Sequence, residues 1–256
     1  MKSLRPRVHA LATSAPKEPD DERPNTVILF DIDGTLVLTG GAGVRAMARA
    51  FEELFAISDA FFGVPMAGRT DASILSDVAA LHNIPPSDLA RFHDVYLTHL
   101  VREVEQPGPR KGIMPGVGDL LEALAARDDV YLALLTGNYE RAARLKLEHF
   151  DLWRYFRCGA FGDGAPDRNS LLPRALARIA ECGGPRATPR DTVVVGDTPL
   201  DVACAAAAGA RSIAVATGSH GVEELRSSGA DFVFPDLSDT SAVIDAIWRS
   251  SSKDEG

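Results

Sequence analysis

Short apolar runs without polar alternation constrain this chain most, because a strand that is apolar on both sides has to be buried on both faces. The runs TVILF at 26–30 and TVVV at 192–195 are examples. Between such runs, apolar residues recur every three or four positions, as they do in amphipathic helices. This alternation predicts a parallel sheet with helices on both faces. The expected strands are 26–30, 130–135, 158–161, 192–195, 212–215 and 231–234, and the helices around them cover about 117–124, 139–150, 171–181, 200–208, 222–228 and 240–248.

One interval, from about residue 38 to residue 112, contains no convincing strand. Its apolar residues form three helical stripes, which include Val44, Ile74 and Leu89. We therefore expect a Rossmann-like α/β core formed by 25–37 and 113–249, and a small α-helical cap domain, 38–112, inserted after the first strand. Residues 1–24 are rich in proline and charged side chains and are expected to form a disordered tail.

Composition excludes several classes of function. The net charge of -9 argues against a nucleic-acid partner, because no basic surplus is available to neutralise phosphates in bulk. No stretch approaches the roughly 20 apolar residues of a membrane span, so no membrane partner is expected. Cys158, Cys182 and Cys204 are widely spaced and form no CxxC pair, which indicates reduced, structural thiols of a cytoplasmic protein. We assign no oligomeric state.

Two carboxylates follow the first strand directly, in the run Asp31-Ile32-Asp33-Gly34. If the chain stays extended, both project in the same general direction, at the carboxyl edge where open α/β sheets bind ligands. Gly34 permits the sharp exit that two acids in one crowded site need.

The fourth strand repeats this arrangement, since Asp197 stands at its end and Asp201 follows one helical turn later. The structural alternative is that Thr198 or Asp197 only caps the helix that Pro199 opens. Several acids that converge at strand ends make an oxygen-rich site, which suits Mg²⁺.

The second expected strand ends in Thr136-Gly137-Asn138. A hydroxyl and backbone N–H groups at the start of a helix can hold an anionic phosphate, although the same residues could also form a simple helix cap.

Together, DIDGTL at 31–36, LLTGN at 134–138 and GDTPLD at 196–201 resemble the first, second and fourth motifs of the haloacid dehalogenase superfamily of hydrolases. The motifs occur in the family's order, and the resemblance extends over about 25–248. The helical insert resembles the family's C1 cap, and the closest group is the phosphoglycolate-phosphatase-like hydrolases.

The resemblance implies a role for each acid. Asp31 would be the nucleophile that forms an aspartyl-phosphate, and Asp33 would be the general acid and then the general base. Mg²⁺ would be held by Asp31, the backbone carbonyl of Asp33 and Asp197, with Asp201 supporting the site. A carboxylate attacks an anion poorly unless a metal and cations cancel the repulsion, so the chemistry agrees with this assignment.

The resemblance also implies phosphate ligands. Thr136 and the N–H groups of Gly137 and Asn138 would bind the phosphoryl oxygens. The third motif departs from the family, which usually has a lysine there. Arg168 lies where that lysine is expected, and Lys146, on the helix after the phosphate loop, is the rival. An arginine can clamp phosphate with two bonds, so we favour Arg168; the alternative for Lys146 is a solvated helix residue.

In the cap, Arg69 precedes an expected helix whose N-cap is Thr70 or Asp71. Arg69 either faces the active site and binds a second anionic group of the substrate, or is solvated.

We therefore predict a phosphate monoester hydrolase that acts on small phosphorylated metabolites such as phosphoglycolate. A dehalogenase is disfavoured, because dehalogenases of this superfamily lack the second aspartate of the first motif. A sugar-phosphate mutase on the same scaffold and a non-catalytic phospho-ligand-binding module remain the alternatives.

Overall fold

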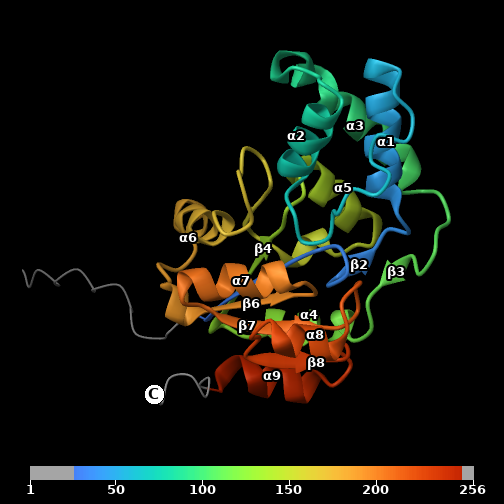
Figure 1. Ribbon diagram of the computed structural model, residues 1–256. Coiled ribbons are helices and arrows are strands. Elements are labelled where there is room, and N and C mark those ends of the chain that lie inside the picture. Colours follow the sequence, from blue (N-terminus) through green and yellow to red (C-terminus); the bar gives the residue numbers. More distant parts are fainter. Residues whose placement is uncertain (1–25, 250–256) are drawn as a thin grey trace, which may run out of the picture.

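A six-stranded parallel sheet forms the centre of the computed structural model, which describes residues 26–249 (Figure 1). The strand order is β5-β4-β1-β6-β7-β8, so the first strand lies between its two functional neighbours. This α/β fold confirms the predicted fold class. The expected tail, 1–24, lies outside the described residues. The strands are β1 (Thr26–Phe30), β4 (Val130–Leu135), β5 (Gly159–Ala160), β6 (Thr192–Gly196), β7 (Arg211–Val215) and β8 (Phe232–Phe234).

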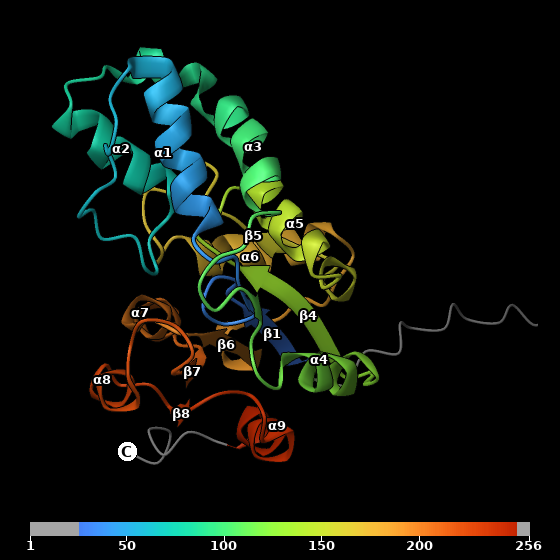
Figure 2. The ribbon, with the colours of Figure 1, turned by 90° about the vertical axis from the view of Figure 1, so that its right-hand side faces the viewer.

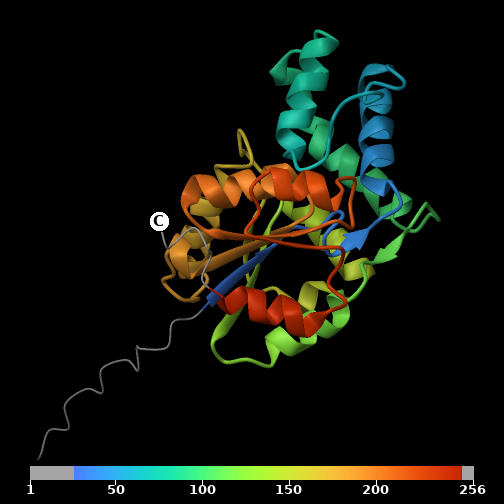
Figure 3. The same ribbon diagram turned by 60° about the horizontal axis from the view of Figure 1, so that its bottom comes forward.

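The apolar runs form buried strands because both faces of the sheet are covered. Ile28 and Phe30 pack into one core cluster, while Val27 and Leu29 pack into another on the opposite face. Figure 3 shows the sheet between its two layers of helices. The helices α4 (Val117–Ala125), α5 (Glu140–His149) and α9 (Thr240–Trp248) pack on the face with Ile28 and Phe30. The opposite face is covered by α6 (Leu171–Glu181), α7 (Pro199–Ala208) and α8 (Val222–Ser227).

The register of the sheet aligns the carboxyl ends of its central strands. Phe30, the last residue of β1, pairs with Leu134 of β4 and with Val195 of β6. The residues that follow these three strands therefore emerge side by side at one edge of the sheet. This edge lies beneath the helices drawn at the top of Figure 1.

Those helices belong to the segment inserted after β1 (Figure 2). Its two connections to the core pair as antiparallel strands, β2 (Val37–Leu38) and β3 (Gly112–Ile113), near the boundaries expected at 38 and 112. The strands were not predicted, because two residues are too few to produce a pattern. The inserted helices are α1 (Ala42–Phe55), α2 (Asp71–Leu81) and α3 (Phe92–Glu103), with a 3₁₀ turn at Pro86–Arg91.

The cap has its own apolar core, and this core extends into the α/β domain. Phe51, Phe92 and Tyr96 are fully buried there, and Tyr139 and Ala142 join them from the start of α5. Helix α5 therefore supports both the sheet and the cap. Leu81, expected in the second stripe, is 69% exposed because it ends α2, so the stripe is shorter than predicted.

Among residues 26–249, no helix combines the length and the apolar character that crossing a membrane requires.

Candidate active site

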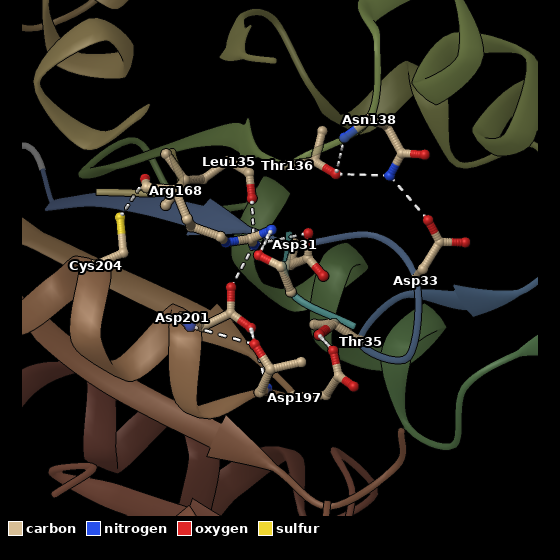
Figure 4. Close-up of polar contacts among 12 residues, drawn as sticks. Asp31, Asp33, Thr35, Leu135, Thr136, Asn138, Arg168, Asp197, Asp201 and Cys204 are labelled. Atoms are coloured by element: carbon tan, nitrogen blue, oxygen red, sulfur yellow. Dashed lines mark hydrogen bonds and ion pairs between the residues drawn. The ribbon is translucent and has the colours of Figure 1, made fainter. Parts of the chain in front are cut away.

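A cavity of about 210 Å³ lies between the carboxyl ends of the central strands and the cap. The core contributes Asp31, Asp33 and Asp197 to its lining, together with the cations Lys146 and Arg168. Figure 4 shows two connected groups, one around Arg168 and one around Asn138. The five charged residues come from four separate stretches of sequence, and the sheet brings them together.

Arg168 lies against Asp31, as the sequence interpretation favoured. Its Nη2 is 2.9 Å from Oδ1 of Asp31, and it also contacts Oδ1 of Asp201. The same nitrogen donates to the carbonyl of Leu135 at 3.1 Å. All three charged side chains are almost completely buried. The guanidinium is therefore the cation that offsets the charge of two buried carboxylates.

Burial and pairing oppose each other at Asp31. Desolvation is the larger effect, and it raises the pKa of Asp31 to about 6, although Arg168 lowers it. Burial lowers the pKa of Arg168, but the charges of Asp201 and Asp31 together raise it by more. The pKa therefore lies above its ordinary value, and the guanidinium stays charged. A charged partner beside a carboxylate that resists ionisation is a common arrangement in catalytic sites.

Asp197 occupies a space that glycines leave open. A Cβ on Gly34 would lie 2.4 Å from Asp197 Oδ2, and a Cβ on Gly218 would lie 1.7 Å from the same atom. Gly34 also has a φ of +90°, so the chain turns sharply directly after the two acids, as expected. Thr35 donates to Oδ1 of Asp197 at 3.2 Å.

The carboxylates form a donor set that fits Mg²⁺. Asp31, Asp197 and Asp201 each offer an oxygen, and these oxygens lie within 4.8 Å of one another. Burial raises the pKa of Asp197 well above its ordinary value, and the neighbouring charges of Asp31 and Asp201 raise it further. A divalent cation would remove this repulsion, and Mg²⁺ prefers oxygen ligands.

Asp201 also links the N-terminus of α7 to Arg168. Its Oδ2 accepts hydrogen bonds from the backbone N–H and the hydroxyl of Thr198, at 3.0 and 2.7 Å, while its Oδ1 contacts Arg168. Thr198 in turn caps α7, and Pro199 occupies the first turn. The helix cap weighed as an alternative to a functional role is therefore present, and it holds Asp201 against Arg168.

Asp33 belongs to the second connected group. Lys146 Nζ lies 2.6 Å from Asp33 Oδ2, and the side-chain amide of Asn138 donates to the same oxygen at 2.8 Å. The ammonium also donates to Oδ1 of Asn138 at 2.6 Å, and Thr136 Oγ1 accepts from the Asn138 amide at 2.8 Å. Both side-chain bonds that Asp33 makes with the described residues thus involve Oδ2. Oδ1 remains available to a ligand.

Lys146 is not the solvated helix residue considered as an alternative. Its side chain is 5% exposed, whereas that of Asp33 is 38% exposed. The two rivals for the missing third motif therefore both lie in the site, but on different carboxylates. The structure places Arg168 at Asp31 and Lys146 at Asp33.

The cap touches the phosphate loop through its backbone. The N–H of Asp71 donates to the carbonyl of Gly137 at 2.7 Å, and a Cβ on Gly137 would lie 2.0 Å from the carbonyl oxygen of Arg69. Arg168 Nη1 donates to the carbonyl of Gly68 at 3.3 Å. The strand-to-helix turn that was expected to bind phosphate is therefore covered by the cap loop 68–71.

Asp71 is a site residue that the sequence interpretation missed, because it was considered only as a helix cap. Thr70 is the N-cap of α2, and Asp71 is buried in the cavity wall, where Oδ2 accepts from the N–H of Tyr139 at 3.0 Å. Burial raises the pKa of Asp71 to about 7, although the nearby Lys146 lowers it. A GRTD run before a helix gives no signal of this burial.

Arg69 also lines the cavity, but its guanidinium binds other residues of the cap and not the carboxylates of the core. Nη2 lies 2.5 Å from Oδ2 of Asp77, and Nη1 donates to the carbonyl of Pro65 at 3.2 Å. Binding of a substrate carboxylate by Arg69 would therefore compete with Asp77. The remaining wall that the cap provides is largely apolar and includes Leu38, Val44, Met47, Met66, Ile74 and Tyr96.

Comparison with known proteins gives the same architecture. The family model for haloacid dehalogenase-like hydrolases matches residues 26–209. Phosphoglycolate phosphatase 1 from Pseudomonas aeruginosa is 30% identical over 270 residues, which cover 89% of this chain and 92% of that protein. Phosphoglycolate phosphatase from Rhodospirillum rubrum is 30% identical and covers 82% of this chain and 87% of its own length.

Solved structures share the fold at lower identity. A hydrolase from Pseudomonas syringae superimposes with a TM-score of 0.63 at 21% identity, over 86% of this chain and 98% of that chain. The beta-phosphoglucomutase from Clostridium difficile gives a TM-score of 0.65 at 14% identity, over 87% of this chain and 96% of that chain. At such identities the likeness shows the fold alone.

Proposed function

Because the chain belongs to the haloacid dehalogenase-like hydrolase family, we propose that it is a magnesium-dependent phosphatase of small phosphorylated metabolites such as phosphoglycolate. The reaction passes through an aspartyl-phosphate on Asp31. The observation that carries this proposal is the contact between Arg168 and Asp31 in a cavity that a second acid, Asp33, also lines.

Asp31 is the group that attacks phosphorus. Arg168 holds one carboxylate oxygen at 2.9 Å and fixes its direction, which leaves the other oxygen for attack. Two negative groups have to approach each other in this step, so a nearby fixed cation lowers the barrier. Arg168 is itself held by Asp201, whose position depends on the cap of α7.

Asp33 moves the proton. Lys146 and Asn138 both bind Oδ2, which holds the carboxyl group in place and leaves Oδ1 for the proton transfer. As a general acid it protonates the leaving oxygen. As a general base it then accepts a proton from the water that cleaves the aspartyl-phosphate.

Mg²⁺ would be held by Asp31 and Asp197, by the backbone carbonyl of Asp33, and with support from Asp201. When bound, the ion supplies charge stabilisation to the phosphoryl oxygens and to the nucleophile. Thr136 and the N–H groups of Gly137 and Asn138 complete the phosphate site.

Substitution of the nucleophile tests the proposal. Asp31→Asn should remain folded and should release no phosphate from phosphoglycolate or from p-nitrophenyl phosphate in the presence of Mg²⁺, because an amide cannot attack phosphorus. Asp128→Asn, in an exposed turn before β4, is the matched control and should retain full activity. Phosphate release by folded Asp31→Asn would rule out the mechanism.

Hydrolysis is distinguished from group transfer by the product. A phosphatase releases inorganic phosphate stoichiometrically with the alcohol, whereas a mutase returns an isomerised sugar phosphate with no net phosphate release. Assays with hexose phosphates in which both products are measured would separate the two reactions.

A further inference from the structure

Two of the three cysteines meet at the edge of the sheet, although 23 residues separate them in the sequence. Cys158 directly precedes the edge strand β5, and Cys182 caps the C-terminus of α6. Their sequence positions gave no sign of a pair. Their meeting results from the packing of α6 against β5.

A single carbonyl group locates both residues. The carbonyl of Arg178 accepts a hydrogen bond from the Cys158 thiol at 3.4 Å and another from the Cys182 backbone N–H at 2.9 Å. Cys182 also raises the pKa of Cys158, as expected of neighbouring thiols. Both residues also line one shallow surface hollow, together with the Arg178 side chain.

We infer that Cys158 and Cys182 are a redox-active thiol pair, which a small-molecule disulfide converts into an intramolecular disulfide bond. Cys204, the third cysteine, lies on α7, is fully buried against the sheet and α6, and takes no part.

The exposure of the two thiols determines which of them reacts first with the small-molecule disulfide. Cys182 is exposed and Cys158 is partly covered, so the reagent reaches Cys182 first. Burial and the nearby Cys182 raise the pKa of Cys158 to about 11, which keeps this thiol protonated at neutral pH. A protonated thiol is a poor nucleophile, so Cys158 acts second, once a mixed disulfide lies beside it.

The atoms and electrons balance with one oxidant molecule. The Cys182 thiolate attacks one sulfur of the reagent RSSR, a protein–S–S–R bond forms, and RS⁻ leaves and takes up a proton. Cys158 then loses its proton and attacks the Cys182 sulfur, which releases the second RSH. The two protein thiols are oxidised, and the reagent is reduced to two thiols.

The bond would close a segment that carries Arg168. Residues 158–182 contain β5, the loop that delivers Arg168 to Asp31, and all of α6. Strand β5 has only two residues and pairs with β4 alone. Closing a loop of this length restricts the unfolded chain, so the oxidised protein should be the more stable form.

The test uses the full-length protein with excess oxidised glutathione at pH 8, followed by alkylation and non-reducing tryptic mapping. We expect the peptides 158–168 and 179–186, which trypsin releases after arginines, to appear joined by a disulfide. The melting temperature should rise by about 5–10 °C and should return to its starting value with dithiothreitol.

Three variants assign the sulfurs. Cys158→Ser should stop at a glutathione adduct on Cys182, Cys182→Ser should leave Cys158 unmodified, and Cys204→Ser should behave as the wild type. The inference is overturned if the wild type stays unmodified, stops at glutathione adducts, links Cys204, or joins two chains. A lower melting temperature on oxidation would also overturn it, because the folded geometry would then oppose the bond.

Discussion

Replacing Arg168 with alanine would leave two buried carboxylates without their cation. Asp31 and Asp201 have side chains that are 6% and 2% exposed, so water cannot take the place of the guanidinium. Breaking such a buried pair costs about 3–5 kcal/mol of the free energy of unfolding. Turnover should fall by roughly 100- to 1,000-fold, because a fixed charge at the reacting phosphoryl group is lost.

Lys146→Ala provides the comparison, since Lys146 is equally buried but its partner is not. Asp33 is 38% exposed and can be hydrated when the ammonium is removed, so the expected loss of stability is only about 1–2 kcal/mol. Turnover should still fall, because Asp33 loses a group that orients it. Neither variant should resemble Arg190→Ala, an exposed substitution expected to change stability by about 0.5 kcal/mol or less.

Urea unfolding at pH 7.5 with a chelator measures these stabilities, and phosphate release with Mg²⁺ measures turnover. The loss for Arg168→Ala should be smaller at pH 5, because Asp31, whose pKa is raised to about 6, is then largely neutral. A cost below about 1 kcal/mol for Arg168→Ala, or a larger cost for Lys146→Ala, would refute the reasoning from partner exposure.

Four further variants test other parts of the site. Asp33→Asn should still bind Mg²⁺, detected by calorimetry, but should turn over at least ~100-fold more slowly, and a rate within a few-fold of wild type would contradict its acid–base role. Arg69→Ala should raise the KM for phosphoglycolate but not for p-nitrophenyl phosphate, and Asp77→Ala, which frees the guanidinium, should lower it; equal effects on both substrates would make Arg69 structural. The pKa of Asp71 is raised to about 7 from 3.8, so its folded form resists ionisation and its contribution to stability falls as pH rises between these values. Asp71→Asn, which is always neutral, should therefore match wild type near pH 4 and exceed it at pH 8 by on the order of 3 kcal/mol in urea unfolding with a chelator; a difference independent of pH would contradict this.

The sheet and the acids at its edge could be predicted from sequence because one physical requirement determines both. A parallel strand buried on two faces needs an uninterrupted apolar run, and β1 and β6 have such runs. A carboxylate directly after the run has to emerge at the carboxyl edge. Asp31 and Asp197 were therefore located by the pattern of their neighbours.

Side chains on helices and loops were harder to interpret, because their environment depends on what packs against them. Lys146 lies on α5 among other charged residues, and it is buried because Gly43 of the cap lies on one side of its ammonium while Asp33 and Asn138 of the core bind it. Asp71 is the first residue of an ordinary helix, and its contact with Tyr139 depends on the docking of the cap. The pairing of Cys158 and Cys182 likewise requires the packing of α6 on the sheet edge.

The docking of the cap through main-chain groups has a consequence for how such a protein can diversify. The carbonyl of Gly137 and the N–H of Asp71 are main-chain groups, which any residue except proline would supply at position 71. Val44, a cavity-lining side chain on α1 that is 44% exposed, can then be exchanged without loss of this contact. Selection can thus alter which alcohol the cavity accepts, while the contact between the cap loop 68–71 and Gly137 stays unchanged.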